Sequence, residues 1–185
     1  MPVKHKQATA YAVWPTAWGP MGAAVGPHGV CCVVLPHYPT DQLRELLSWE
    51  CPAAVQDEAP FEQFIALTRD YFNAQVVDFR PIPCELPPAG GFAEMVVRAC
   101  RAIPYGQTRS YHFVAEAVGG GGQAARAVAA ALGRNPTPLL VPCHRVTYAD
   151  GRIGGFSAAG GEALKARLLK LEQSVVAGEK PAATP

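Results

Sequence analysis

The sequence predicts an α+β protein that divides into two small domains. Short apolar runs separated by Gly and Pro turns, within residues 10–35, indicate strands. Apolar residues at helical spacing indicate amphipathic helices within residues 61–72 and 92–103. Two short helices on either side of four consecutive glycines, residues 119–122, form a helix-turn-helix pattern. A length of 185 residues accommodates one domain of ordinary size or two small ones.

The first half has the pattern of a scaffold domain. We expect strands at residues 11–14, 21–25, 30–35 and 76–79, where apolar runs lie between turn residues. Thr40 is the expected N-cap of a helix that ends near Trp49, and Pro60 suits the first turn of a second helix.

A segment rich in Pro and Gly separates the two halves. Residues 81–91 contain four prolines, which remove backbone donors and disfavour a helix, so this segment is the expected linker. The expected boundaries are 1–80 for the first domain, 92–174 for the second and 175–185 for a mobile tail.

The second half begins with a helix at residues 92–103 that has one apolar face. Ser110 is the expected cap of the next helix, and residues 123–132 would form the recognition helix of the helix-turn-helix. That third helix is mostly alanine, with Arg126 as a long cation in its middle. Because direct readout of bases needs polar side chains, an alanine surface reads no sequence. Residues 139–141 are expected to form a short buried strand.

Charge is divided unevenly between the halves. Residues 1–89 hold 5 Lys and Arg against 9 Asp and Glu, whereas residues 90–185 hold 11 against 6, so a polyanion would be drawn to the second half. No apolar run approaches the ~20 residues of a membrane helix, and the first residues lack the apolar core of a secretion signal. Without export, the six cysteines are expected to be reduced thiols.

Cys143 and His144 are the candidates for chemistry. A free Cys titrates near about 8.5, so it needs a base to become a thiolate nucleophile at neutral pH. A nearby imidazole can take the proton while a third group orients that imidazole. Because adjacent side chains diverge, we expect His144 to reach Cys143 through a water. Taken alone, the pair is a weak signal of catalysis, because cysteine is often buried and inert.

The segment Val141-Pro-Cys-His-Arg-Val146 resembles the active-site motif of the O6-alkylguanine-DNA alkyltransferases. Residues 103–111 resemble the family's entry to its helix-turn-helix, residues 124–128 its recognition helix and residues 134–136 its Asn hinge. Residues 154–157 and 165–172 resemble its closing segment. The resemblance is close over residues 92–172 and holds in outline over residues 1–80. It implies a ribonuclease H-like α/β first domain and a winged-helix-like second domain.

The family resemblance implies DNA repair by direct reversal of damage. A methyl or larger alkyl group would pass from O6-alkylguanine in DNA to Cys143; activity on O4-alkylthymine and the preferred alkyl group are left open. His144 is the implied base, Glu172 the carboxylate that orients it, and Tyr111 the group that supports the leaving guanine at N3. Since water does not hydrolyse the thioether product, each chain is expected to react once, without a cofactor.

The resemblance also implies a set of contacts to the extruded base. The backbone carbonyls of Cys143 and Val146 would accept from the guanine amino group, and Ser157 would donate to O6. Phe156 stands where some relatives have Tyr, so a hydroxyl contact from that position is absent.

Double-stranded DNA is the implied partner, held through its minor groove with the alkylated base flipped out, which costs a few kcal/mol. Arg126 would fill the gap left by the flipped nucleotide, and Tyr111 would help to rotate it. Ala125, Ser110 and Asn135 complete the implied DNA-binding set, with Asn135 tying the recognition helix to the active-site turn. We expect a monomer, with cooperative binding along DNA left open.

Some relatives hold zinc through Cys and His in the first domain. Here His28, Cys31, Cys32 and Cys84 are the candidates, but they include no C-x-x-C pair, so we expect no metal.

Three other functions compete with alkyl transfer. Alkyltransferase-like proteins bind the lesion without chemistry and have Trp at the nucleophile position, where this chain has Cys143. A plain helix-turn-helix regulator would carry polar base-reading side chains, and a cysteine hydrolase would turn over repeatedly. We expect a protein that is not secreted, located in the cytoplasm of a prokaryote or the nucleus of a eukaryote.

Overall fold

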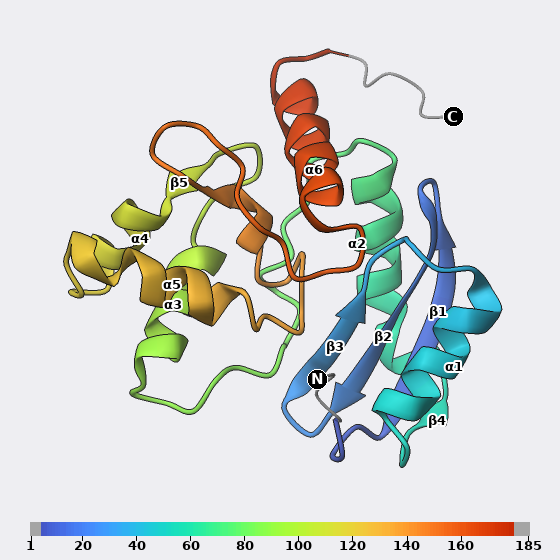
Figure 1. Ribbon diagram of the computed structural model, residues 1–185. Coiled ribbons are helices and arrows are strands. Elements are labelled where there is room, and N and C mark those ends of the chain that lie inside the picture. The colour runs from blue at the N-terminus through green and yellow to red at the C-terminus, as the bar shows by residue number, and fades with distance from the viewer. Residues whose placement is uncertain (1–4, 180–185) are drawn as a thin grey trace. The chain divides into compact units, whose positions relative to one another are not determined.

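The computed structural model describes residues 5–179 and has a mixed α/β fold (Figure 1). The chain divides into two compact units, with the division between Glu85 and Leu86. Within the described range, no helix combines the length and the apolar character that a membrane crossing requires. All six cysteines are free thiols.

A four-stranded sheet forms the centre of the first unit, in the order β3-β2-β1-β4. The first three strands form an antiparallel meander, and β4 pairs parallel with β1. Their apolar runs predict the first three strands, whereas β4 has only two residues, both exposed, and carries no such signal. The strands are β1 (Ala10–Thr16), β2 (Gly19–Gly26), β3 (Gly29–Val34) and β4 (Val55–Gln56).

Two helices cover opposite faces of this sheet (Figure 1). Val13 and Trp14 are neighbours on β1 and therefore point to opposite faces. Val13 packs in a core with Leu47 of the first helix, whereas the Trp14 ring meets Phe64 of the second edge-on, with centroids 5.7 Å apart. The Trp14 indole N–H also donates to the Thr68 hydroxyl over 2.9 Å. The helices are α1 (Thr40–Glu50) and α2 (Glu62–Phe72).

Two local expectations in this unit were wrong. Thr40 is the first residue of α1 and not its cap; Pro39 occupies the cap position, without a side-chain hydrogen bond. Residues 76–79 form no strand. Of these residues only Phe79 is buried, with its ring 5.6 Å from the Tyr71 ring and 6.0 Å from the Phe64 ring, whereas Val76 is exposed.

The expected linker is in part an extension of the first sheet. The Val30 N–H donates to the Pro83 carbonyl, and the Glu85 N–H donates to the Val30 carbonyl, each over 2.9 Å. Cys84 thereby forms a parallel bridge with Val30 of β3. An edge strand offers unpaired backbone groups, and a proline can still satisfy them through its carbonyl. Proline content alone therefore did not reveal this pairing.

The second unit is mainly helical. Its first three helices pack against one another, and its last packs against the 3-10 turn Cys143–Arg145. A two-residue parallel pairing of β5 with β6 places the start of α4 beside the end of that turn. The elements are α3 (Phe92–Arg101), β5 (Arg109–Ser110), α4 (Tyr111–Ala117), α5 (Ala125–Leu132), β6 (Val146–Thr147) and α6 (Gly161–Val176).

The caps and ends of these helices differ in part from expectation. Ser110 caps α4 as expected, since its Oγ accepts from the Phe113 N–H over 3.0 Å. A 3-10 turn, Gly122–Ala124, precedes α5, which therefore begins two residues later than expected. α6 continues to Val176, and residues 180–185 of the expected tail lie outside the described residues.

The strand expected at residues 139–141 does not form. Leu139 has a φ of 73°, which no strand accommodates, and the Val141 N–H donates to the Thr137 carbonyl over 2.9 Å. The segment is a buried turn, and a short buried apolar run does not by itself distinguish a turn from a strand.

Candidate active site

Cys143 lies at the start of the 3-10 turn, directly after the buried turn at residues 137–141. Its side chain is nearly enclosed, with the residue 5% exposed. The Asn135 Nδ2 donates to Cys143 Sγ over 3.1 Å and to the Val141 carbonyl over 2.9 Å. Burial raises the pKa of the Cys143 thiol, while the Asn135 hydrogen bond and the Lys165 ammonium act in the opposite direction. The surroundings thus offset part of the cost of forming a buried thiolate.

His144 is fully buried and held by Glu172. Its Nε2 lies 2.8 Å from Glu172 Oε1. Burial lowers the pKa of His144, although the Glu172 carboxylate raises it, so the imidazole is neutral. We assign the proton to Nε2, because only a protonated nitrogen can donate to the carboxylate. Nδ1 then carries a free lone pair and has no hydrogen-bond partner among residues 5–179, which is the state of a general base.

Glu172 is an ionised carboxylate held on both oxygens. Arg145 donates from Nε to Oε2 and from a terminal nitrogen to Oε1, each over 2.9 Å, and the Gly106 N–H donates to Oε2 over 2.9 Å. Burial by itself raises the pKa of Glu172, but His144 and Arg145 outweigh it and the pKa falls to about 2. The carboxylate therefore fixes the imidazole without taking its proton.

Arg145 was not among the expected site residues, although it lies within the Cys-His-Arg motif itself. It is buried, and its third contact is a 2.8 Å hydrogen bond to the Ile103 carbonyl. The motif thus supplies the nucleophile, the base and the cation that pairs with the orienting carboxylate.

A pocket of about 300 Å³ opens beside the nucleophile. Four of the expected site residues contribute to its wall, and the Tyr148 ring packs 5.3 Å from the Tyr111 ring. Tyr148 was not expected, because a single exposed tyrosine in a loop gives no sequence signal. The pocket is lined by Tyr111, Ala129, Leu132, Gly133, Cys143, Tyr148, Gly155, Phe156 and Ser157.

The other expected residues lie outside the pocket wall. Arg126 is exposed on α5, with no ion pair among the described residues, and Ala125 is half-buried beside it. The Ser110 hydroxyl serves as a helix cap, and Asn135 contacts the nucleophile directly. Val146 is buried.

Lys165 of α6 was also not among the expected site residues, although it is 1% exposed. Its Nζ donates to the Val146 carbonyl over 2.7 Å and lies 3.4 Å from both the Gly155 carbonyl and the Tyr111 hydroxyl. Burial lowers the pKa of Lys165, and the Cys143 thiolate would raise it. A lysine in an amphipathic helix usually points to solvent, so sequence pattern gave no reason to place it inside.

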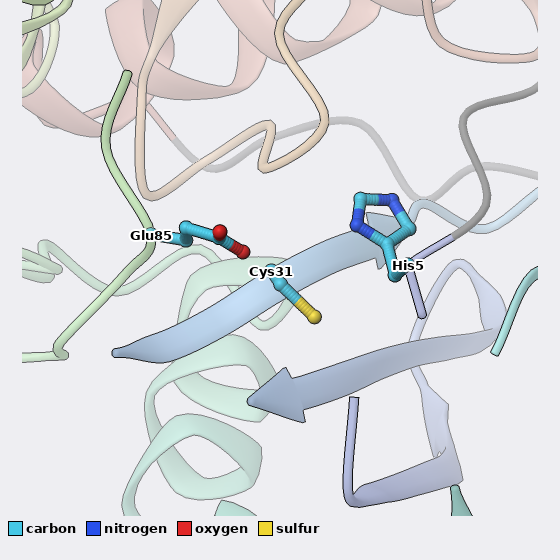
Figure 2. A group of neighbouring side chains, drawn as sticks. All are labelled: His5, Cys31 and Glu85. Carbon is cyan, nitrogen blue, oxygen red and sulfur yellow. The ribbon is translucent and has the colours of Figure 1, made fainter. Parts of the chain in front are cut away.

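A separate group of possible ligands lies in the first unit, where His5, Cys31 and Glu85 approach one another (Figure 2). Their ligand atoms all lie within 4.8 Å of one another. Burial raises the pKa of Cys31 to about 12, and its Sγ donates to the Ala24 carbonyl over 3.5 Å.

Zinc binds cysteine as a thiolate, and coordination itself removes the thiol proton, so the raised pKa describes Cys31 without an ion. Of the residues considered from sequence, His28, Cys32 and Cys84 join no group of three donors within residues 5–179. No step of the chemistry below involves a metal.

Comparison with known proteins gives consistent matches. Residues 91–174 match the family model described as 6-O-methylguanine DNA methyltransferase, DNA binding domain. A protein from Mycobacterium tuberculosis, named methylated-DNA–protein-cysteine methyltransferase, is 40% identical over 119 residues, which cover 64% of this chain and 68% of that protein. One of the same name from Metallosphaera sedula is 36% identical over 129 residues, which cover 68% of this chain and 78% of that protein.

A solved structure agrees with these matches over nearly the whole chain. The crystal structure of M. tuberculosis OGT in complex with DNA has a TM-score of 0.74 and 30% sequence identity, and the match covers 95% of this chain and 97% of that one. The resemblance indicated by the sequence motifs is thereby confirmed, and this chain belongs to the family of methylated-DNA–protein-cysteine methyltransferases.

Proposed function

We propose that this protein repairs alkylated DNA directly, by moving an alkyl group from O6 of guanine onto Cys143 in a single turnover. The observation that carries this proposal is that Cys143 lines a pocket while the neighbouring His144 is neutral, unpartnered at Nδ1 and held by an ionised Glu172. Nucleophile, base and orienting group are the three parts that activation of a thiol requires. Membership of the methyltransferase family supports the same activity.

The chemistry is a displacement at the alkyl carbon. No hydrogen bond joins Cys143 Sγ to the His144 imidazole within the described residues, so a water carries the thiol proton to Nδ1. The thiolate then forms a bond to the alkyl carbon as the bond from that carbon to O6 breaks. The electron pair of the broken bond stays on guanine, which regains a proton at N1. That proton balances the one that Cys143 lost, and the thioether remains on the protein.

The leaving guanine needs hydrogen bonds as its negative charge develops. Tyr111 and Ser157 line the pocket and supply hydroxyl groups, Tyr111 toward N3 and Ser157 toward O6. Burial raises the pKa of Tyr111 to about 12, so the phenol keeps its proton and acts as a donor. The carbonyls of Cys143 and Val146 accept from the guanine amino group, which an adenine lacks at that position.

The DNA-bound form places α5 in the minor groove of duplex DNA with the alkylated base in the pocket. Support comes from the small side chains along α5 and from Arg126, whose guanidinium is exposed and forms no ion pair within residues 5–179. One chain contributes every residue named here, so the acting unit is a monomer. The substrate is chromosomal, which places the activity in a prokaryotic cytoplasm or a eukaryotic nucleus.

The finer fold names belong to the same proposal. The β3-β2-β1-β4 order, with a parallel fourth strand, supports a ribonuclease H-like first domain. The packing of α4 against α5 across a glycine turn, with the β5–β6 pair, supports a winged-helix-like second domain, to which we assign the chemistry over residues 92–174.

An intact-mass measurement tests this function. The protein is incubated with a duplex that contains one O6-methylguanine, and its mass is compared with that after an unmodified duplex. We expect a gain of one methyl group per chain, which Cys143→Ala abolishes and Cys51→Ala, a change of a buried thiol in the first unit, retains. Binding without a mass change would indicate a lesion sensor, and repeated release of product would indicate a hydrolase.

A further inference from the structure

Lys165 is a buried cation that forms no ion pair within residues 5–179, although the exposed Glu162 carboxylate on the same helix favours its charge. Its three nearest acceptors are two carbonyls, of Val146 and Gly155, and the Tyr111 hydroxyl. Within residues 5–179 it forms no ion pair with a carboxylate. Because a buried charge without a countercharge is costly, a lysine at 1% exposure indicates a compensating negative charge in some state of the protein.

The charges around the nucleophile identify that state. The buried Glu172 carboxylate is paired with Arg145, and His144 is neutral, so these three contribute no net charge. Lys165 adds one positive charge while Cys143 is a thiol. Formation of the Cys143 thiolate brings the net charge of these five buried side chains to zero. After the alkyl group has moved, the sulfur is neutral and the negative charge is on the guanine.

We propose that Lys165 is a positioning residue whose ammonium offsets the negative charge of the reaction, first on Cys143 sulfur and then on the departing guanine. This inference rests on the proposed function. Lys165 keeps its proton throughout and takes part in no bond exchange. The negative charge that Lys165 balances moves from the Cys143 sulfur to the guanine in the pocket, so the ammonium need not move.

The contacts of Lys165 also orient two groups that face the guanine. An ammonium is a donor only, so the Tyr111 oxygen accepts from it and the phenolic proton is directed elsewhere, toward the pocket that Tyr111 lines. The Val146 carbonyl has two lone pairs, of which Lys165 uses one and leaves the other for the guanine amino group. One cation thereby supports both a donor to the base and an acceptor from it.

The pH dependence of Cys143 is the direct readout of this charge. The other titratable groups around the nucleophile must be held constant when Lys165 is changed. They are Cys100 on α3, Tyr111 on α4, His144 and Arg145 in the 3-10 turn, Tyr148 after β6, and Glu162 and Glu172 on α6.

The test compares Lys165→Met with Lys165→Arg and with Lys170→Met, which removes an exposed lysine from the same helix. Each protein is treated with iodoacetamide over a range of pH without DNA, and alkylation of Cys143 is followed by mass spectrometry. We expect Lys165→Met to raise the midpoint by about one pH unit and to slow methyl transfer from duplex about tenfold. We expect Lys165→Arg to keep the wild-type midpoint, and Lys170→Met to leave both the midpoint and the rate of methyl transfer unchanged. An unshifted midpoint in a folded Lys165→Met protein overturns the inference.

A second measurement decides the matter if Lys165→Met does not fold. In protein labelled with 15N-lysine, the Lys165 ammonium is titrated by NMR with Cys143 present and in the Cys143→Ser variant. Linkage requires that a thiolate stabilised by Lys165 stabilises the ammonium in return, so we expect the Lys165 midpoint to fall in Cys143→Ser. An unchanged midpoint contradicts the inference. Failure of the wild-type protein to gain a methyl group would instead refute the proposed function, because neither titration uses DNA.

Discussion

The Asn135 side-chain amide donates to Cys143 Sγ over 3.1 Å while its own oxygen accepts from the Thr137 N–H over 3.0 Å. The same amide nitrogen also donates to the Val141 carbonyl. A single side chain three residues after the end of α5 therefore holds both ends of the buried turn that precedes the nucleophile, and it aims a donor at the sulfur. This links the helix assigned to DNA with the atom assigned to chemistry.

Replacing Asn135 tests that link. Asn135→Ala removes the hydrogen bond to sulfur, and we expect methyl transfer to slow about tenfold, the equivalent of ~1.4 kcal/mol. Asn135→Asp places a carboxylate beside the sulfur, which raises the pKa of Cys143 further, so its rate falls below that of the alanine variant. Single-turnover kinetics on duplex substrate give the order, and an aspartate variant as fast as wild type would contradict it.

The Glu172 network predicts a specific dependence of stability on pH. The pKa of Glu172 is lowered to about 2, so its stabilisation is fully present above its ordinary value of 4.5 and is lost as the pH falls toward 2. Glu172→Gln should cost about 3 kcal/mol in the free energy of unfolding at pH 7, because it leaves Arg145 buried and unpaired. The difference from wild type should shrink below pH 4.5.

Urea unfolding at several pH values measures this difference, with Glu45→Gln as the control for an exposed carboxylate. A deficit that stays constant from pH 7 to pH 3 would show that folding does not lower the pKa of Glu172.

Gly106 allows the backbone to approach Glu172. It has a φ of 73°, and a Cβ there would overlap with Val176 Cγ2 and lie 3.3 Å from the Glu172 carbonyl oxygen. Gly151 has a similar φ of 84°, but a Cβ there meets nothing within 4 Å. Gly151→Ala therefore measures the backbone strain alone, of about 1–2 kcal/mol, and Gly106→Ala should destabilise the protein by more.

Thermal unfolding of the two alanine variants separates the contributions of strain and overlap. Adding Val176→Ala should recover part of the Gly106→Ala loss, since it removes the overlapping methyl group. Equal losses at the two glycines would contradict the close approach.

Arg126 is expected to act only when a base must leave the duplex. Arg126→Ala should slow methyl transfer from duplex DNA far more than it slows alkylation by free O6-benzylguanine, because only the duplex leaves a gap to be filled. Arg69→Ala removes an exposed arginine from the first unit and controls for the loss of one positive charge. Equal slowing on the two substrates would rule out this role for Arg126.

The protein is expected to act without a metal. We expect elemental analysis to find no stoichiometric zinc and EDTA to leave both the melting temperature and methyl transfer unchanged. His5→Ala provides the complementary test, because it removes one member of the His5–Cys31–Glu85 group. One zinc per chain that His5→Ala removes would show that these three side chains close around an ion.

The sequence predicted α1 to α5 and the long strands because each carries its own periodic pattern, whereas α6 was not predicted as a helix, and part of it was noted only as a segment that resembles the family's closing segment. Ser110 was identified as a cap because its effect is local, through the Phe113 N–H three residues away. Leu139 shows the limit of that approach. Its run of apolar residues indicates burial correctly, but the positive φ that makes the segment a turn follows from packing around Asn135 and Thr137, which no local pattern reports.

The same distinction between local patterns and long-range packing applies to the candidate site. Cys143, His144 and Glu172 were identified through a family resemblance, and the structure brings His144 and Glu172 into contact from positions 28 residues apart. Lys165 and Tyr148 were missed, because a lysine in an amphipathic helix and a tyrosine in a loop have surface positions as their usual environment. Their place at the pocket depends on contacts between segments that are distant in the chain.

The pairing of Val30 with Pro83 and Glu85 decides where the polypeptide can be divided. A recombinant fragment that stops at residue 80 would leave the N–H and the carbonyl of Val30 without their hydrogen-bond partners. It would also expose an unpaired sheet edge to other molecules, which is a known route to aggregation. A cut after Glu85 keeps the Val30 main chain paired and that sheet edge protected. Anyone preparing the two halves for independent study should therefore cut beyond the prolines that first suggest the junction.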